Sequence, residues 1–154
     1  MSKAEERRDS LIIAVQDFFT RNAGRFKVQM SFLYGSRAEG IPREDSDTDI
    51  AILYEDEITS EEEIFDLSTR ISVSLSKEMR VEANVLAIYP DFRKPMLYYN
   101  VIVKGIPVHI ADYNRYLDLR TEAIFQMEDF EIFGNKWQLL VSRRNLAGLD
   151  YAGI

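Results

Sequence analysis

The first apolar pattern along the chain has the period of a helix. From Ser10, apolar residues recur at spacings of three and four, as they do on one face of an amphipathic helix. They are Leu11, Ile12, Val15, Phe18 and Phe19. We predict a helix from about Ser10 to residues 22–24, where asparagine and glycine are typical of a helix end.

The next two segments have the composition of β-strands. Residues 28–34 are β-branched and aromatic, and they alternate in two sets. One set is Val28, Met30, Phe32 and Tyr34, and the other is Gln29, Ser31 and Leu33. The strand is predicted to stop at Gly35, and a loop rich in glycine, proline and charge leads to a second strand from Asp47 to Leu53.

A second helix and a third strand are predicted in the middle of the chain. Ser60 and Glu63 resemble a capping box, and helical spacing continues to about Lys77 through Ile64, Leu67, Ile71 and Leu75. Residues 79–88 then alternate as a strand. One face would carry Glu82, Asn84, Leu86 and Ile88, and the other Val81, Ala83, Val85 and Ala87.

The last third of the chain is predicted to be mainly helical. We first expect a helix around 96–102 that ends near Gly105, followed by a short strand at 107–110. A helix from Asp112 to about Phe130 comes next. A last helix with Trp137, Leu140 and Val141 precedes a tail at Gly148.

This order of elements predicts the fold class. A small mixed β-sheet flanked by helices, of the α/β (α+β) type, fits it better than a regular doubly wound sheet. We expect one domain over residues 1–154, with a core at about 10–110 and a C-terminal helical extension at about 112–154.

Composition narrows the classes of function. With 154 residues, 46% of them hydrophobic, the chain can bury the core of one domain. Its net charge of -7 argues against nucleic acid as a partner. Because it has no cysteine, it offers neither disulfides nor thiolate metal ligands. We find no apolar run of about 18 residues, so we expect a cytoplasmic protein with no membrane association.

The segment Tyr-Gly-Ser-Arg-Ala-Glu-Gly at residues 34–40 has the features of a phosphate-binding turn. Gly35 directly after a strand lets the backbone approach a ligand closely. Ser36 offers a hydroxyl and a backbone N–H to a phosphate oxygen. If a helical turn begins at Arg37, its amides add to the same anion site. Gly35, Ser36 and Arg37 are therefore candidate nucleotide-binding residues.

Two carboxylates shortly after that turn predict a metal site. Asp47 and Asp49 lie two residues apart at the start of a strand, so both side chains point to one face. Such a pair can hold a divalent cation, and an oxygen-only site suits Mg²⁺, which also binds nucleotide phosphates. A carboxylate-held metal supplies the charge neutralisation that nucleotidyl transfer needs.

A third carboxylate would complete a two-metal site, and Glu82 on the third strand is the candidate. The candidate catalytic residues and metal ligands are therefore Asp47, Asp49 and Glu82. Asn84 shares the face of Glu82. The alternative for Glu82 is an exposed strand acid paired with Lys77 or Arg80.

These motifs together resemble a known family. Gly35-Ser36, ten intervening residues and then Asp47-Thr48-Asp49 are similar to the signature of the minimal nucleotidyltransferase (MNT) family, in the DNA polymerase beta-like nucleotidyltransferase superfamily. The resemblance implies a mixed sheet on which Gly35 and Ser36 grip a nucleoside triphosphate and Asp47 and Asp49 hold Mg²⁺. Family members commonly carry an aspartate on the third strand, where this chain offers Glu82 or Asn84.

The resemblance also implies a function. We expect Mg²⁺-dependent transfer of AMP from ATP to an acceptor hydroxyl. The acceptor would be a HEPN-type toxin protein, with this chain as the MntA-type antitoxin of a toxin–antitoxin pair. Transfer to a small molecule such as an aminoglycoside, or a catalytically silent nucleotide- or partner-binding module, are the alternatives. The oligomeric state stays open, a homo-oligomer included.

Overall fold

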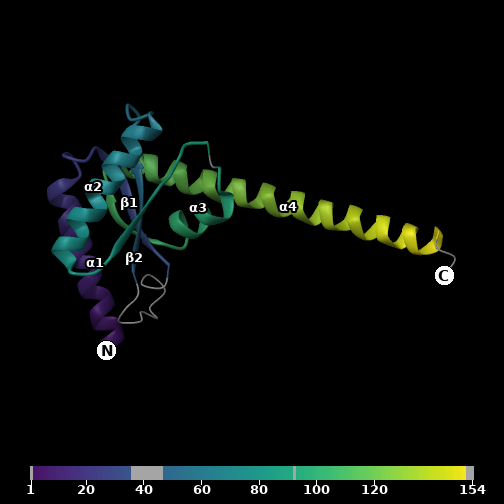
Figure 1. The fold of residues 1–154 in the computed structure, drawn as a ribbon, viewed down its shortest axis with the longest axis horizontal. Coiled ribbons are helices and arrows are strands. Elements are labelled where there is room, and N and C mark those ends of the chain that lie inside the picture. The colour runs from purple at the N-terminus through teal and green to yellow at the C-terminus, as the bar shows by residue number, and fades with distance from the viewer. Residues whose placement is uncertain (1, 36–46, 92, 152–154) are drawn as a thin grey trace.

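The computed structural model describes residues 2–35, 47–91 and 93–151. Helices and strands alternate irregularly along these residues (Figure 1). In order they are α1 (Lys3–Asn22), β1 (Val28–Tyr34), β2 (Thr48–Tyr54), α2 (Glu61–Met79), β3 (Ala83–Ala87), α3 (Pro95–Ile102), β4 (Ile106–Ile110) and α4 (Tyr113–Tyr151).

The strands form one mixed sheet in the order β3-β2-β1-β4. β1 runs antiparallel to both of its neighbours, β2 and β4, whereas β2 and β3 are parallel. A parallel pair needs a crossover connection, and α2 provides it. The predicted fold class, a small mixed sheet flanked by helices, is confirmed.

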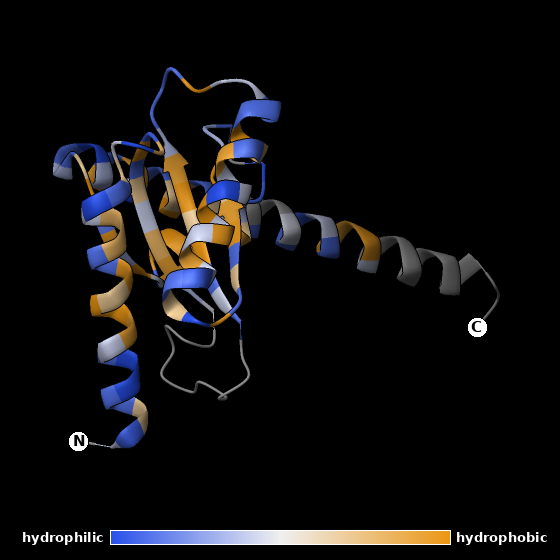
Figure 2. Cartoon of the chain, turned by 60° about the vertical axis from the view of Figure 1, so that its left-hand side comes forward, coloured by the Kyte–Doolittle hydropathy of each residue, from blue (hydrophilic) through white to orange (hydrophobic). Residues whose placement is uncertain are grey.

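Helices cover both faces of the sheet (Figure 2). On one face, α1 and α2 pack Val15, Phe19, Ile71 and Leu75 against side chains such as Ile50, and all of these are fully buried. On the other face, α3 and α4 contribute Tyr98, Val101, Ile102, Tyr116, Leu119 and Ala123. Burial of these two apolar clusters is the main force that holds the three layers together.

A β-bulge changes the predicted faces of β1. Val28 was expected to share a face with Met30 and Phe32, but it packs with Leu33 in the cluster beneath α1 and α2. The pairing of β1 with β2 shifts register between Val28 and Met30. An extra residue in one strand reverses the side-chain alternation beyond it, which explains the difference.

Two helix boundaries differ from the prediction. α1 begins at Lys3 rather than near Ser10, because Ser2 and Glu5 form a reciprocal capping box. α2 runs to Met79 and ends at Arg80, which adopts the left-handed conformation with φ of 58°. β3 therefore begins at Ala83 rather than Met79, although its faces alternate as predicted.

The two helices predicted after residue 112 are one helix, α4. Gly134 does not interrupt it, and the helix continues past Gly148, where a tail was expected, to Tyr151. The second half of α4 extends away from the sheet into solvent (Figure 1). Trp137, Leu139 and Leu140 are accordingly exposed. No helix within the described ranges is long and apolar enough to cross a membrane.

Candidate functional site

The site lies where β1 ends and β2 begins. These strands are antiparallel, so their ends meet, and Tyr34 pairs with Asp49. Gly35 follows with φ of 77°, a conformation that favours glycine. A Cβ at Gly35 would lie only 2.7 Å from Oδ2 of Asp49. The bare backbone of Gly35 is therefore placed directly against the Asp49 carboxylate.

Asp47 and Asp49 project from one face of β2, as predicted. Thr48 stands between them and is fully buried toward the opposite face, whereas Asp47 is exposed and Asp49 is half-buried. Alternation along β2 places both carboxylates on the face that carries Ala51 and Leu53. This is the face covered by α3 and α4 farther along the sheet.

Asn84 joins the two aspartates. It is in parallel register with Asp49 on the neighbouring strand β3. Its side-chain amide Nδ2 donates to Oδ2 of Asp47 at 3.1 Å and lies 3.5 Å from Oδ1 of Asp49. One amide group thus touches both carboxylates, and the two acids stand close enough to share a single partner.

Burial and a neighbouring negative charge raise the pKa values of Asp49 and Tyr34. Burial raises the pKa of Asp49, the Asn84 hydrogen bond opposes that rise, and the negative charge of Asp47 adds to it. The pKa of the Tyr34 phenol is raised by burial and by the charge of Asp49. A cation between the carboxylates would offset both the burial of the Asp49 charge and its repulsion by Asp47.

The donor atoms fit a hard divalent cation. Two carboxylates converge on one point, and rotation of the Asn84 amide would present its Oδ1 there in place of Nδ2. Within residues 2–35, 47–91 and 93–151, no group of three acidic, histidine or cysteine side chains is arranged to hold a metal. The described part of the site therefore offers two acids and one amide.

Of the other predicted site residues, only Glu82 lies within the described part of the chain. Glu82 is exposed just before β3, and its backbone carbonyl accepts a hydrogen bond from the Thr48 N–H at 2.8 Å. This places Glu82 beside β2, but its carboxylate makes no hydrogen bond or ion pair to a described residue, so its role stays a prediction. Ser36 and Arg37 lie outside the described residues.

Two features of the site were not predicted. The bridging contact of Asn84 depends on the parallel register of β2 and β3, which no local pattern encodes. The proximity of Tyr34 to Asp49 follows from the antiparallel pairing of β1 and β2. The sequence contained an indication of this contact, because Tyr34 directly precedes Gly35 and Asp49 lies near the start of the next strand.

The family follows from comparison with known sequences. The family described as "Polymerase beta, Nucleotidyltransferase" matches residues 15–114, which include both aspartates, Gly35 and Asn84. The chain therefore belongs to the polymerase beta nucleotidyltransferase family. No curated protein matches the sequence significantly.

Solved structures share the fold. A chain of a toxin–antitoxin crystal structure with AMP-PNP aligns with a TM-score of 0.58 and 16% identity, over 82% of this chain and 95% of that one. A second structure contains a tri-AMPylated HEPN toxin of Shewanella oneidensis in complex with its MNT antitoxin. Its matching chain aligns with a TM-score of 0.55 and 14% identity, over 85% of this chain and 96% of that one. At such identities the likeness concerns the fold.

Proposed function

We propose that the protein is a Mg²⁺-dependent nucleotidyltransferase that transfers AMP from ATP to a hydroxyl group of a partner protein. The observation that carries this proposal is the convergence of Asp47 and Asp49 on one amide group beside the bare backbone of Gly35. A metal-binding acid pair next to a phosphate-binding turn is the minimum that nucleotidyl transfer requires.

Asp47 and Asp49 would hold the metal, and Asn84 would orient them. Mg²⁺, when bound, supplies neutralisation of the triphosphate charge and polarises the α-phosphate. Gly35, whose bare backbone lies against Asp49, would bind the nucleotide through that backbone, with Ser36 and Arg37 as further nucleotide-binding candidates. Glu82 is the candidate to take the proton of the acceptor hydroxyl. The acceptor oxygen then bonds to the α-phosphorus, the bond to the bridging oxygen breaks, and pyrophosphate leaves.

For the acceptor we propose a HEPN-type toxin in the same cytoplasm, with this chain as the antitoxin. Support comes from the described contents of the similar structures, namely AMP-PNP in one and an AMPylated HEPN toxin in the other. A hydroxyl on a folded partner also suits an exposed site, since Asp47, Glu82 and Asn84 all reach solvent.

The test is label transfer from α-³²P-ATP in the presence of Mg²⁺ and a HEPN-type toxin as the acceptor. We expect labelled partner with the wild type and none with Asp47→Ala plus Asp49→Ala. Glu62→Gln is the matched control, because it removes an exposed carboxylate from the first turn of α2, which follows the opposite end of β2 from the aspartates. Undiminished labelling by the double variant would refute the proposal.

The presence of an amide at Asn84 supports one alternative to an active enzyme, namely a catalytically silent module that binds its partner without nucleotidyl transfer. An amide cannot act as a base at neutral pH, and in this structure it satisfies both carboxylates. If the double variant still neutralises the toxin in cells and no label is transferred by the wild type, the silent module is correct. Label on an added aminoglycoside instead of the protein would identify a small-molecule acceptor.

A further inference from the structure

The outer edge of β3 is capped at both ends and open in the middle. β3 is an edge strand that pairs only with β2 in the sheet. The Glu82 carbonyl and the Ile88 N–H bond to β2, so backbone groups of residues 82, 84, 86 and 88 face inward. Those of residues 83, 85, 87 and 89 face outward.

Side chains satisfy the outward groups at each end. At the start of β3, the Ala83 N–H donates to Oγ of Ser76 at 3.0 Å, and the Ala83 carbonyl accepts from Oγ of Ser72 at 2.6 Å. Beyond the end of β3, the Tyr89 N–H donates to the Tyr98 hydroxyl at 3.2 Å. Such caps prevent continuous pairing along the edge.

The outward groups of Val85 and Ala87 have no such caps. Ser68 continues the stripe of Ser72 and Ser76 one turn earlier on α2, but its hydroxyl bonds instead to that of Tyr54 at 2.7 Å. No other described residue bonds to the outward N–H and C=O groups of Val85 and Ala87. Two donors and two acceptors therefore stand in a row, which is the pattern that an added strand pairs with.

These groups form the floor of a groove. A hollow of about 310 Å³ follows residues 85–87, with Phe65 and Ser68 of α2 on one side and Lys94 and Tyr98 on the other. Phe65 is 73% exposed, which is unusual for so large an apolar side chain. The groove thus combines unpaired backbone with an apolar wall.

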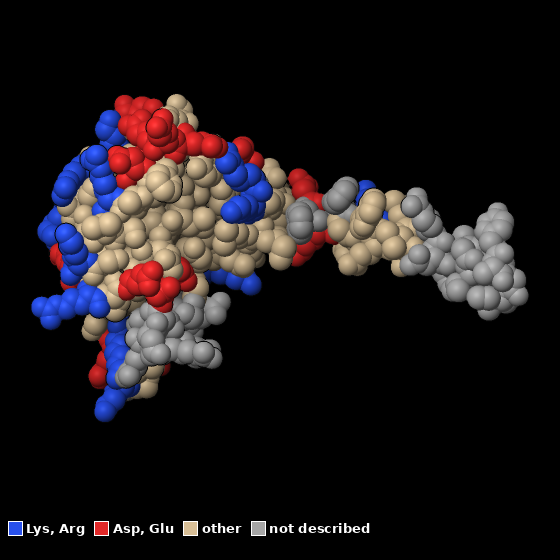
Figure 3. Space-filling model, in the orientation of Figure 1, with Lys and Arg blue, Asp and Glu red and all other residues tan. Residues whose placement is uncertain are grey.

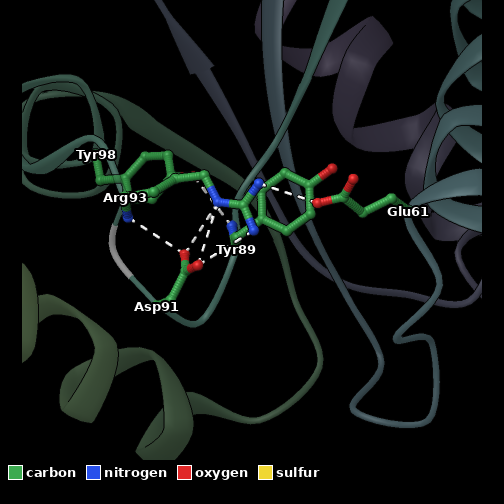
Figure 4. Close-up of polar contacts among 5 residues, drawn as sticks. All are labelled: Glu61, Tyr89, Asp91, Arg93 and Tyr98. Carbon is green, nitrogen blue, oxygen red and sulfur yellow. Dashed lines mark hydrogen bonds and ion pairs between the residues drawn. The ribbon is translucent and has the colours of Figure 1, made fainter.

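Two basic side chains, Arg93 and Lys94, line one end of the groove. Arg93 stacks on the Tyr89 ring at 3.8 Å and bonds to both oxygens of Asp91 and to Glu61 (Figure 4). This network neutralises Arg93. Lys94 also lines the groove, makes no ion pair with a described residue, and caps α3 through its backbone rather than its side chain. Lys94 is therefore the groove's available cation.

From these contacts we infer that the β3 edge is a docking site for an extended peptide segment of a partner protein. The segment pairs its backbone with Val85 and Ala87, packs an apolar side chain on Phe65, and places a carboxylate near Lys94. This site is independent of the proposed nucleotidyl transfer, because it uses none of Gly35, Asp47, Asp49 or Asn84.

A second copy of the chain does not fit the same groove. Its own β3 edge would lie between the same two walls, formed by α2 and by the residues around Lys94. Two strands that each lie at the floor of such a groove cannot approach to the roughly 4.8 Å that pairing requires. A single strand without flanking helices can.

The test uses ¹⁵N-labelled full-length protein and a fluorescein-labelled peptide Thr-Val-Thr-Val-Thr-Glu. We expect saturable binding in which the amide signals of Val85 and Ala87 move most. Ala87→Pro removes one outward N–H without removing a bond to β2, and edge strands tolerate such a proline. It should weaken binding about fivefold to tenfold, as expected for one hydrogen bond. The control Val73→Thr changes an exposed position of α2 that does not line the groove, and it should bind as the wild type does.

A charge exchange tests the site without touching the strand. Lys94→Glu should weaken binding of this peptide and strengthen binding of one that ends in lysine. Unchanged affinity in both Ala87→Pro and Lys94→Glu would overturn the proposal, as would shifts confined to residues away from 85–94. Movement of the Val85 and Ala87 signals with protein concentration alone would also overturn it, in favour of self-pairing.

Discussion

At the scale of single residues, the site depends on how closely Gly35 approaches Asp49. Replacement of Gly35 by alanine would place a Cβ 2.7 Å from Oδ2 of Asp49 and would force a φ of 77° on a residue that avoids it. The left-handed conformation alone costs about 1–2 kcal/mol. We expect Gly35→Ala to lower the thermal midpoint and, because the carboxylate must move, to reduce label transfer.

The control for this prediction is Gly24→Ala. A Cβ at Gly24 meets nothing within 4 Å, and its φ is not positive. The control should keep both stability and activity. Equal behaviour of the two variants in calorimetry and in the labelling assay would show that the contact between Gly35 and Asp49 is unimportant.

The raised pKa of Asp49 predicts a pH dependence of stability. As pH rises, the unfolded chain loses this proton first, near the ordinary value of 3.8. The contribution of Asp49 to the free energy of unfolding therefore falls until pH exceeds the folded pKa, and at neutral pH the charge is destabilising. Without metal, Asp49→Asn should raise the thermal midpoint at pH 7, with a gain that shrinks below pH 4, while label transfer is lost. A lower midpoint at pH 7 would contradict this.

Asn84 sets the number of acids in the site. Asn84→Asp would place a third carboxylate beside Asp47 and Asp49, where an amide now touches both. We expect tighter Mg²⁺ binding by calorimetry and faster label transfer, together with lower stability without metal because three like charges repel. If transfer by Asn84→Asp is unchanged while Glu82→Gln abolishes it, Glu82 already supplies the third acid.

The sequence predicted those parts of the site that are close in the chain. Gly35, Asp47 and Asp49 could be grouped because one loop joins them and strand alternation orients the two acids. Asn84 was predicted only as a neighbour of Glu82 and as its alternative on the third strand. Its contact with the aspartates could not be predicted, since that contact requires the parallel pairing of two strands separated by a helix. Register between distant strands is a tertiary property that local periodicity does not encode.

At the scale of elements, the interiors of helices and strands were predicted better than their ends. β1 was predicted with its observed bounds because it lies between clear turn residues. The start of α1 was placed too late because its first two turns are polar, although Ser2 and Glu5 carry a readable capping signal. The end of α2 was harder to predict, since arginine rather than glycine adopts the left-handed position.

The close packing of the turn between α3 and β4 leads to a prediction about stability. A Cβ at Gly105 would lie 2.2 Å from the Val101 carbonyl oxygen and 3.0 Å from that of Leu33. Both atoms belong to the backbone and cannot simply rotate away. We expect Gly105→Ala to destabilise the protein by about 1–3 kcal/mol in urea denaturation. Gly134→Ala, where the added Cβ meets open space, should cost nothing; equal midpoints for both variants would argue against this packing.

At the scale of the whole molecule, the charge of the surface is unevenly distributed. Figure 3 shows acidic side chains gathered in patches on this face of the domain, with basic side chains between and beside them. The net charge of -7 is consistent with a protein partner rather than a nucleic acid. The net charge can be counted from the sequence, whereas the grouping of charged side chains into surface patches depends on the fold.

At this scale, the main difference between the sequence-based prediction and the structure is the extent of α4. Among the α4 side chains that the structure describes, the buried ones are Tyr116, Leu119 and Ala123, and they lie in the first third of the helix. We expect removal of residues 132–154 to change the thermal midpoint of the domain by less than about 2 °C, since none of the described side chains of this segment, those of residues 134–142, is buried. Loss of cooperative unfolding in calorimetry would instead show that the distal helix supports the core. Two helices were predicted because helical spacing was recognised as far as Met127 and again around Trp137, whereas the structure has one continuous helix.

The distal part of α4 also determines what optical measurements report. Trp137 is the only tryptophan of the chain, and it is 60% exposed on that part of the helix. Its emission should therefore resemble that of tryptophan in water while the domain is still folded. Denaturation followed by tryptophan fluorescence would report the environment of one helix and not the loss of the sheet. The same isolation makes Trp137 a built-in probe, whose quenching or spectral shift would signal that another molecule has covered the helix.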